Sequence, residues 1–204
     1  MTDSGPIRAF LAIPASQTWL DSAEMLTRRM KPSLPEASWT RPSSWHLTLV
    51  FMGEIPRQAV ERFVAGMPPL AENCSRGALK PGEAVVFPGS GRARVLSVGF
   101  AASPIREALE HLSHQAHALA SSCLAPARLP DEKRFHPHVT LARIRRPWPR
   151  ASVDAFRSEV EQASLPTWPV ERCVLFESNL QRDGAVHTPV EQWPLGQSAY
   201  MARA

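Results

Sequence analysis

A chain of 204 residues is long enough for one sizeable hydrophobic core, and its 44% hydrophobic and 21% charged residues exclude a largely disordered or fibrous protein. No apolar run reaches the roughly 18 residues of a membrane span, and the N-terminus lacks a basic leader, so we expect a soluble, cytoplasmic protein without a membrane partner. The net charge is +4, and all but three of the 23 basic residues are arginines, whose planar guanidinium groups suit an anionic ligand.

The first half of the chain mixes apolar strand patterns with helical ones. We expect strands over residues 7–14 and 45–52, a helix from residue 16 to about residue 30, and a short helix over 57–65. Gly53 is expected to end the second strand. Gly66 and the prolines at 68 and 69 are expected to end the short helix.

Two predicted strands, 84–87 and 94–100, come next. The Gly-x-Gly between them favours a hairpin turn over a phosphate-binding loop, because no helix start follows at once. The remaining predicted elements, in order, are a helix over 104–123, a strand over 138–144, a helix over 152–163 and strands over 171–180 and 185–193. Strict β-α-β alternation is missing, so the sequence predicts an α+β fold with antiparallel pairing.

Metal and disulfide sites are not indicated. The histidines at 111, 114 and 117 follow one another at spacings of three, so each turns about 60° from the last and the trio spreads over a solvated helix face. The three cysteines lie far apart in sequence and fit neither a disulfide framework nor a zinc knuckle. We therefore expect no metal and no cofactor.

Two of the predicted strands contain the same four-residue pattern, His-x-Thr-Leu. It occurs at His46 and Thr48 in "WHLTLVF" and, 92 residues later, at His138 and Thr140 in "PHVTLAR". Two such copies should arise by chance in fewer than about one chain in a thousand. Each copy precedes a predicted helix, so we interpret residues 1–204 as one bilobal domain made of two diverged repeats.

Strand alternation gives the pattern a physical meaning. In each strand the histidine and the threonine share one face, while the leucines share the other face and can pack in a core. Displacement at phosphorus needs a base and an acid on opposite sides, and two imidazoles can divide these tasks near neutral pH. Threonine hydroxyls can donate hydrogen bonds to the non-bridging oxygens, and no metal is required.

The two motifs, together with "RAFLAIP", "HLTLVFMGE", "RFHPHVTLAR" and "VLFESNL" in this order, resemble the two-histidine (2H) phosphoesterase superfamily. Within it, the chain is similar to the bacterial and archaeal RNA 2',3'-cyclic phosphodiesterases, historically called 2'-5' RNA ligases. The resemblance implies two antiparallel sheets with outer helices, related by a pseudo-twofold axis, and an active-site cleft between them. It also implies metal-independent hydrolysis of a 2',3'-cyclic phosphate at an RNA 3' end to a 2'-phosphomonoester.

Residue roles follow from the same resemblance. It implies that His46 is the proton donor to the leaving oxygen and His138 the proton acceptor that activates water, with Thr48 and Thr140 binding the phosphate. The two motifs read alike, so the sequence by itself does not distinguish the acid from the base. We expect RNA with a cyclic phosphate end as the partner, tRNA fragments being one source of such ends, and a monomeric enzyme.

Further substrate contacts are candidates. Arg143 can pair with phosphate only if a bulge or the strand end brings it round to the face of His138. Arg134, in a basic stretch before the second motif, can guide an RNA backbone or belong to an ordinary charged rim. Phe51 can stack on a base, but its parity with Leu47 and Leu49 favours packing in the core. The pattern favours a surface or partly buried role over a catalytic one for His187.

Two other functions remain open at this point. Another 2H enzyme would keep the mechanism and act on 2'-5' linkages, including reversible joining of tRNA halves, or on small cyclic nucleotides. A non-catalytic RNA-binding module would keep the fold alone. The intact pair of motifs weighs against the module, because a binder needs no acid and base.

Overall fold

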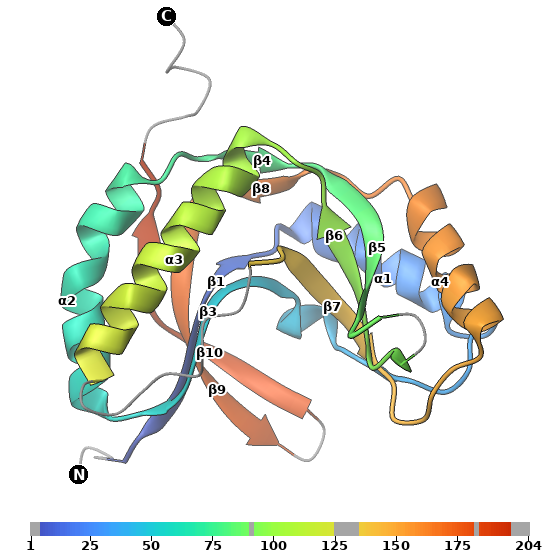
Figure 1. Ribbon diagram of the computed structural model, residues 1–204, viewed down its shortest axis with the longest axis horizontal. Helices are drawn as coiled ribbons and strands as arrows, with labels where there is room; N and C mark the ends of the chain where they lie inside the picture. Colours follow the sequence, from blue (N-terminus) through green and yellow to red (C-terminus); the bar gives the residue numbers. More distant parts are fainter. Residues whose placement is uncertain (1–4, 90–91, 125–134, 182–183, 197–204) are drawn as a thin grey trace, which may run out of the picture.

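The computed structural model describes residues 5–89, 92–124, 135–181 and 184–196 (Figure 1). Within these ranges the helices are α1 (Gln17–Met30), the 3-10 turn η1 (Pro42–Ser44), α2 (Arg57–Asn73), α3 (Pro104–Leu124) and α4 (Arg150–Gln162). The strands are β1 (Ile7–Pro14), β2 (Ser38–Trp39), β3 (His46–Ile55), β4 (Gly77–Leu79), β5 (Pro81–Phe87), β6 (Val95–Phe100), β7 (His138–Arg143), β8 (Trp168–Val170), β9 (Arg172–Gln181) and β10 (Gly184–Pro194).

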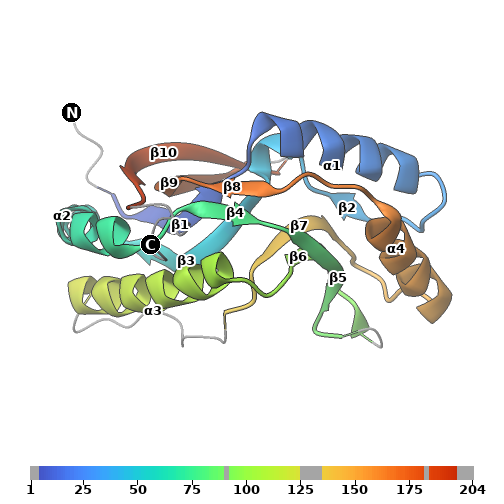
Figure 2. The same ribbon diagram turned by 90° about the horizontal axis from the view of Figure 1, so that it is seen from above.

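Segments far apart in the chain are interleaved in two antiparallel sheets. The first sheet has the strand order β10-β9-β1-β3 and the second has the order β2-β7-β6-β5, while β4 and β8 form a small third sheet. The first sheet thus joins the start of the chain to its end, and β2 crosses over to join the second. Helices α2 and α3 pack together against the first sheet, and α1 and α4 lie beside the second (Figure 2). The expected α+β fold with outer helices is confirmed.

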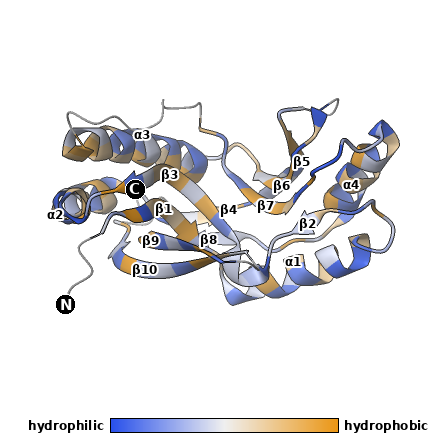
Figure 3. Ribbon diagram, turned by 90° about the horizontal axis from the view of Figure 1, so that it is seen from below, coloured by the Kyte–Doolittle hydropathy of each residue, from blue (hydrophilic) through white to orange (hydrophobic). Residues whose placement is uncertain are grey.

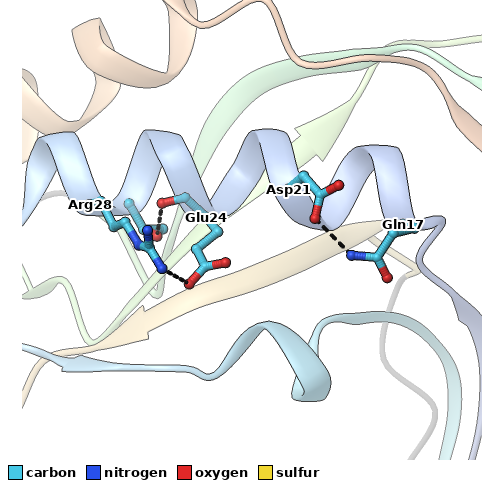
Figure 4. A network of polar contacts seen from close by, with 5 residues as sticks. Gln17, Asp21, Glu24 and Arg28 are labelled. Carbon is cyan, nitrogen blue, oxygen red and sulfur yellow. Dashed lines mark hydrogen bonds and ion pairs between the residues drawn. The ribbon is translucent and has the colours of Figure 1, made fainter.

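Helix α1 shows how the outer helices attach to the core. It begins after Ser16, whose Oγ accepts a hydrogen bond from the backbone N–H three residues on. On its exposed side Gln17 bonds Asp21 and Arg28 pairs with Glu24 (Figure 4). Such exposed pairs are worth only about 0.3–0.5 kcal/mol each. Burial of the opposite side therefore dominates, and the alternating colours of α1 and α3 in Figure 3 reflect these two sides.

Helix α2 is longer than the sequence predicts, because it runs through Gly66 and both prolines to Asn73. Gly66 is a packing position rather than a stop: a Cβ added there would lie 2.7 Å from Leu119 Cδ1 of α3. Met67 and Ala71 are buried, whereas the prolines are exposed. Core packing of the last turns thus outweighs the hydrogen bonds that the prolines cannot donate.

Two other boundaries differ from the prediction. Strand β3 continues past Gly53 to Ile55, because Gly53 adopts a φ of 72° and still pairs with Ala9 of β1. The short strands β2, β4 and β8 are missed, since segments of two or three residues carry no periodic pattern. No helix in the described ranges is both long enough and apolar enough to cross a membrane.

Candidate active site

The first motif strand, β3, contains a β-bulge directly after its threonine. Ala12 of β1 pairs with Thr48, and the preceding residue of β1, Leu11, pairs with Val50. Leu49 is therefore the extra residue that has no partner of its own. A bulge of this kind lets two consecutive side chains, Leu49 and Val50, both lie on the buried side.

The second motif strand, β7, has the same bulge at the same place. Ser97 of β6 pairs with Thr140, and Leu96 pairs with Ala142, so Leu141 is the extra residue. Leu141 and Ala142 are again both fully buried. The two motif strands therefore repeat a backbone irregularity as well as a sequence pattern.

The bulges change which face the following residue occupies. Phe51 pairs with Phe10, whose ring stacks on His46, and Arg143 pairs with Val95, two residues from the partner of Thr140. Both residues thus lie on the face that carries the histidine and the threonine, which we call the motif face of each sheet. Core packing of Phe51 was the wrong expectation, because its side chain is 43% exposed. The bulge in β7 brings Arg143 to the motif face, which was the condition for the predicted contact with phosphate.

Each motif histidine is fixed by a backbone carbonyl two residues earlier. His138 Nδ1 lies 2.6 Å from the oxygen of His136, and His46 forms a backbone hydrogen bond to Ser44. A ring that donates through one nitrogen presents the other nitrogen as a proton acceptor. In both strands the sequence therefore positions one free ring nitrogen on the motif face.

His46 lies in apolar surroundings. Its ring stacks on Phe10 at 4.5 Å between centroids, with Phe176 at 6.5 Å and a further imidazole, His187, at 5.2 Å. Burial, helped by the charges of His187 and His138, lowers the pKa of His46 to about 4, although the Ser44 carbonyl opposes this. The effect of His138 means that the two motif histidines are close enough to interact.

His138 has more polar neighbours. Its ring lies 4.8 Å from Phe87 of β5, and burial is the main reason that its pKa falls below the ordinary value. The positive charge of Arg143 lowers the pKa further, which also places this guanidinium near the ring. Both motif histidines are therefore neutral at pH 7 in the free protein.

A hydrogen-bonded bridge links the two motif strands. The indole Nε1–H of Trp45, the residue before His46, donates to Thr40 Oγ1 at 2.6 Å. The Thr40 hydroxyl lies 2.8 Å from the carbonyl oxygens of both Thr140 and the bulge residue Leu141. Side-chain and backbone groups of the two motifs are thus held together through one threonine, and β3 and β7 contact each other although they belong to different sheets.

The first motif has a guanidinium nearby as well. Arg8 of β1 lies over the Phe51 ring, with 4.8 Å from its Cζ to the ring centroid. The sequence did not single out Arg8, Phe10, Phe176 or Phe87. His187 is half-buried, as the sequence predicts. The alternation in "IRAFLAIP" was a usable signal, because residues 8, 10 and 12 share the motif face once β1 pairs with β3. Arg134 lies outside the described residues.

No metal-binding cluster is found in the described part of the chain: no three side chains of histidine, cysteine, aspartate or glutamate converge on one point. On α3, His111 and His114 are exposed, as the sequence predicts, and His117 is half-buried.

The arrangement at the motif faces offers two neutral imidazoles, two hydroxyls and a guanidinium. This set can exchange protons and bind an anion.

Comparison with known proteins gives consistent matches over most of the chain. Residues 16–97 and 103–187 match the family model described as LigT like Phosphoesterase. The chain is 31% identical over 155 residues to a Thermus thermophilus protein named RNA 2',3'-cyclic phosphodiesterase, covering 76% of this chain and 73% of the relative. A protein of the same name from Aquifex aeolicus is 25% identical over 191 residues, which cover 93% of this chain and 98% of the relative.

The fold also matches solved structures. The crystal structure of a protein from Thermus thermophilus superposes with a TM-score of 0.74 at 26% identity, covering 94% of this chain and 99% of that one. Both motif strands lie within the matched regions of the family model. The chain therefore belongs to the LigT-like phosphoesterases of the 2H superfamily.

Proposed function

We propose that this protein hydrolyses the 2',3'-cyclic phosphate at the 3' end of an RNA to a 2'-phosphomonoester, by acid–base catalysis that needs no metal. The observation that supports this most directly is the pair of equivalent strands, each with a carbonyl-anchored histidine followed by a threonine and a bulge. The names of the relatives support the choice of substrate.

In the proposed reaction, His138 takes a proton from water as the water oxygen attacks phosphorus. The bond from phosphorus to O3' breaks, and His46 donates a proton to O3', so the phosphate remains on O2'. The hydroxyls of Thr48 and Thr140 donate hydrogen bonds to the non-bridging oxygens, where negative charge is held. Arg143 pairs with the same oxygens, because a guanidinium binds phosphate in a planar fork.

This mechanism requires one histidine to be protonated when substrate is bound. In the free protein burial keeps the pKa of both rings low. An anionic phosphate beside an imidazole favours its charged form and raises its pKa. Substrate binding therefore favours the protonated form of the histidine that acts as the acid. The pKa values of the free protein do not decide which of the two histidines this is. We assign it to His46 on the family resemblance.

Recognition of the rest of the RNA is assigned to the residues around the motif faces. The exposed Phe51 ring offers a stacking surface for a base next to the phosphate, and Arg8 and Arg143 offer positive charge. Arg134 belongs to this proposal by sequence alone. We further propose that residues 1–204 form one domain of two diverged repeats, and that the enzyme works as a cytoplasmic monomer on RNA ends such as those of tRNA fragments.

The test is to offer the purified protein an oligoribonucleotide with a 2',3'-cyclic phosphate and to identify the product by phosphorus NMR, with and without EDTA. We expect a 2'-phosphomonoester in both samples. A 3'-phosphomonoester, or activity that EDTA abolishes, would contradict the mechanism. Parallel samples with 2'-5'-linked RNA, tRNA halves and small cyclic nucleotides test the alternative 2H reactions, and binding without turnover of any of them would indicate an RNA-binding module.

A further inference from the structure

A third imidazole lies beside His46 and has no part in the reaction described above. His187, on β10, lies 5.2 Å from the His46 ring, with an angle of 88° between the planes. It also meets Phe10 edge-on at 4.9 Å, and the same Phe10 ring stacks on His46. Phe176 lies 6.5 Å from both imidazoles. We call these four rings the ring cluster.

The strand pairing holds His187 in this place. His187 pairs with Ser178 of β9, and Phe176 of the same strand pairs with Phe10 of β1. Alternation therefore puts His187 on the motif face. The hydroxyl of Ser44, whose carbonyl anchors His46, donates a hydrogen bond of 3.2 Å to the Ala185 carbonyl of β10. His46 and His187 are thus tied to a common backbone frame.

The ring nitrogens of His187 argue against a purely structural role. Its Nδ1 is buried and has no hydrogen-bond partner among the described residues. A buried polar atom without a partner costs about 1–3 kcal/mol, and an apolar ring of similar shape would avoid that cost. If His187 served only to pack against Phe10, phenylalanine would serve better. The imidazole therefore calls for a chemical explanation.

Few other charged groups act on this ring in the described part of the chain. On β1 and β3, Arg8 and Glu54 lie opposite each other on the motif face, and the Arg8 guanidinium lies over the Phe51 ring. On β9, the residues that face the ring cluster are Phe176 and Ser178, which carry no charge. Among the described residues, His46 is the one titratable group whose ring contacts His187 directly. A proton on His187 therefore acts most strongly on the neighbouring His46 ring.

We propose that His187 is a positioning residue for the phosphodiesterase reaction proposed above: it fixes the His46 ring edge-on and, when protonated, keeps a second proton off His46. The two rings form a coupled pair that accepts one proton readily and a second with difficulty. The less buried His187 takes the first proton as the pH falls.

The charges in the ring cluster support this coupling. After burial, the charge of His187 is the largest cause that lowers the pKa of His46, ahead of the charge of His138. Burial also lowers the pKa of His187 itself. The consequence for the reaction is that His46 stays neutral in the free protein, even in mild acid, and takes its proton when an anionic substrate arrives.

The test is an NMR titration of the histidine rings in the free, full-length protein, comparing the wild type with His187→Gln and His187→Phe. Both variants remove the neighbouring charge, and His187→Phe keeps an aromatic ring against Phe10. We expect the His46 midpoint to rise by roughly 0.5 in pH in both variants, while the His138 midpoint stays in place. The exposed His111→Gln is the matched control and should move neither midpoint.

A second readout links the titration to the reaction. In the pH profile of kcat/KM, the limb that belongs to His46 should move upward in the same two variants, and the other limb should stay. An unchanged His46 midpoint in folded His187→Phe would overturn the proposal. The titration needs no substrate, so it remains decisive if the protein proves inactive on cyclic phosphates, and the two proposals can fail separately.

Discussion

The two motif strands share a backbone and differ in what surrounds it. In both, a carbonyl holds the histidine and a bulge follows the threonine. Around His46, however, the neighbours are Phe10, Phe176 and His187, whereas His138 lies near Phe87, His136 and Arg143. Two motif strands with the same backbone can therefore have different roles, because the side chains on neighbouring strands decide how easily each imidazole is protonated.

The two motif strands also differ in the residue that follows the bulge, at positions 51 and 143. Both follow the bulge, and both reach the motif face, but one is an aromatic ring and the other a cation. The first motif obtains its cation from the neighbouring strand, through Arg8 over the Phe51 ring. In the proposed reaction the phosphate therefore pairs with Arg143 next to His138, and the Phe51 ring of the first motif is the proposed stacking surface for a base.

Removing either imidazole should have the largest effect. His46→Ala and His138→Ala should each lower kcat for cyclic phosphate hydrolysis by about 10²–10⁴, the usual share of general acid–base catalysis. Steady-state kinetics with one cyclic phosphate substrate measure both variants, and His111→Ala on α3 controls for loss of a surface histidine. If one variant keeps full activity in a folded protein, the division of labour between the two strands is wrong.

The residues after the bulges should separate binding of phosphate from binding of the base. Arg143→Met should lower kcat/KM about 10-fold or more for every substrate, because a charge-assisted hydrogen bond is lost. Phe51→Leu should raise KM for an RNA several-fold and leave a minimal cyclic mononucleotide nearly unchanged. Michaelis kinetics on both substrates check this. Equal losses for Phe51→Leu on both substrates would assign it to the fold instead.

The buried histidines should also make the free energy of unfolding depend on pH. The pKa of His46 falls from 6.5 to about 4 on folding, so between these values the unfolded chain binds a proton that the folded chain does not. Stability is therefore lost as the pH drops through this window and is regained as it rises. His46→Asn should reduce this loss by about 2 kcal/mol.

Urea unfolding at about pH 4.5, near the lower end of this window, and at about pH 7.5, above it, measures the difference. The matched variant His138→Asn should reduce the loss in the same direction, because burial lowers the pKa of His138 as well. A wild type that is equally stable at both pH values would mean that neither ring is held neutral by its surroundings.

Strand alternation was enough to place the four motif side chains, because His46, Thr48, His138 and Thr140 precede the bulges. It failed at Phe51, since nothing in "TLVF" marks the extra residue, and a bulge is defined only by the partner strand. For His187 the partly buried position was predicted correctly, but two of its neighbours were not, since Phe10 and His46 lie on β1 and β3, more than a hundred residues earlier in the chain. The local sequence pattern predicts on which face of a strand a side chain lies. Which side chains surround it depends on pairing with strands that are distant in the chain.

The interleaving of the strands has a consequence for unfolding. The sheet that carries His46 contains β9 and β10, which follow the second motif in the chain. The sheet that carries His138 contains β2, which precedes the first motif in the chain. A fragment with a single motif would lack part of its sheet. We therefore expect one cooperative unfolding transition for the described sheets, with no half of the chain melting by itself.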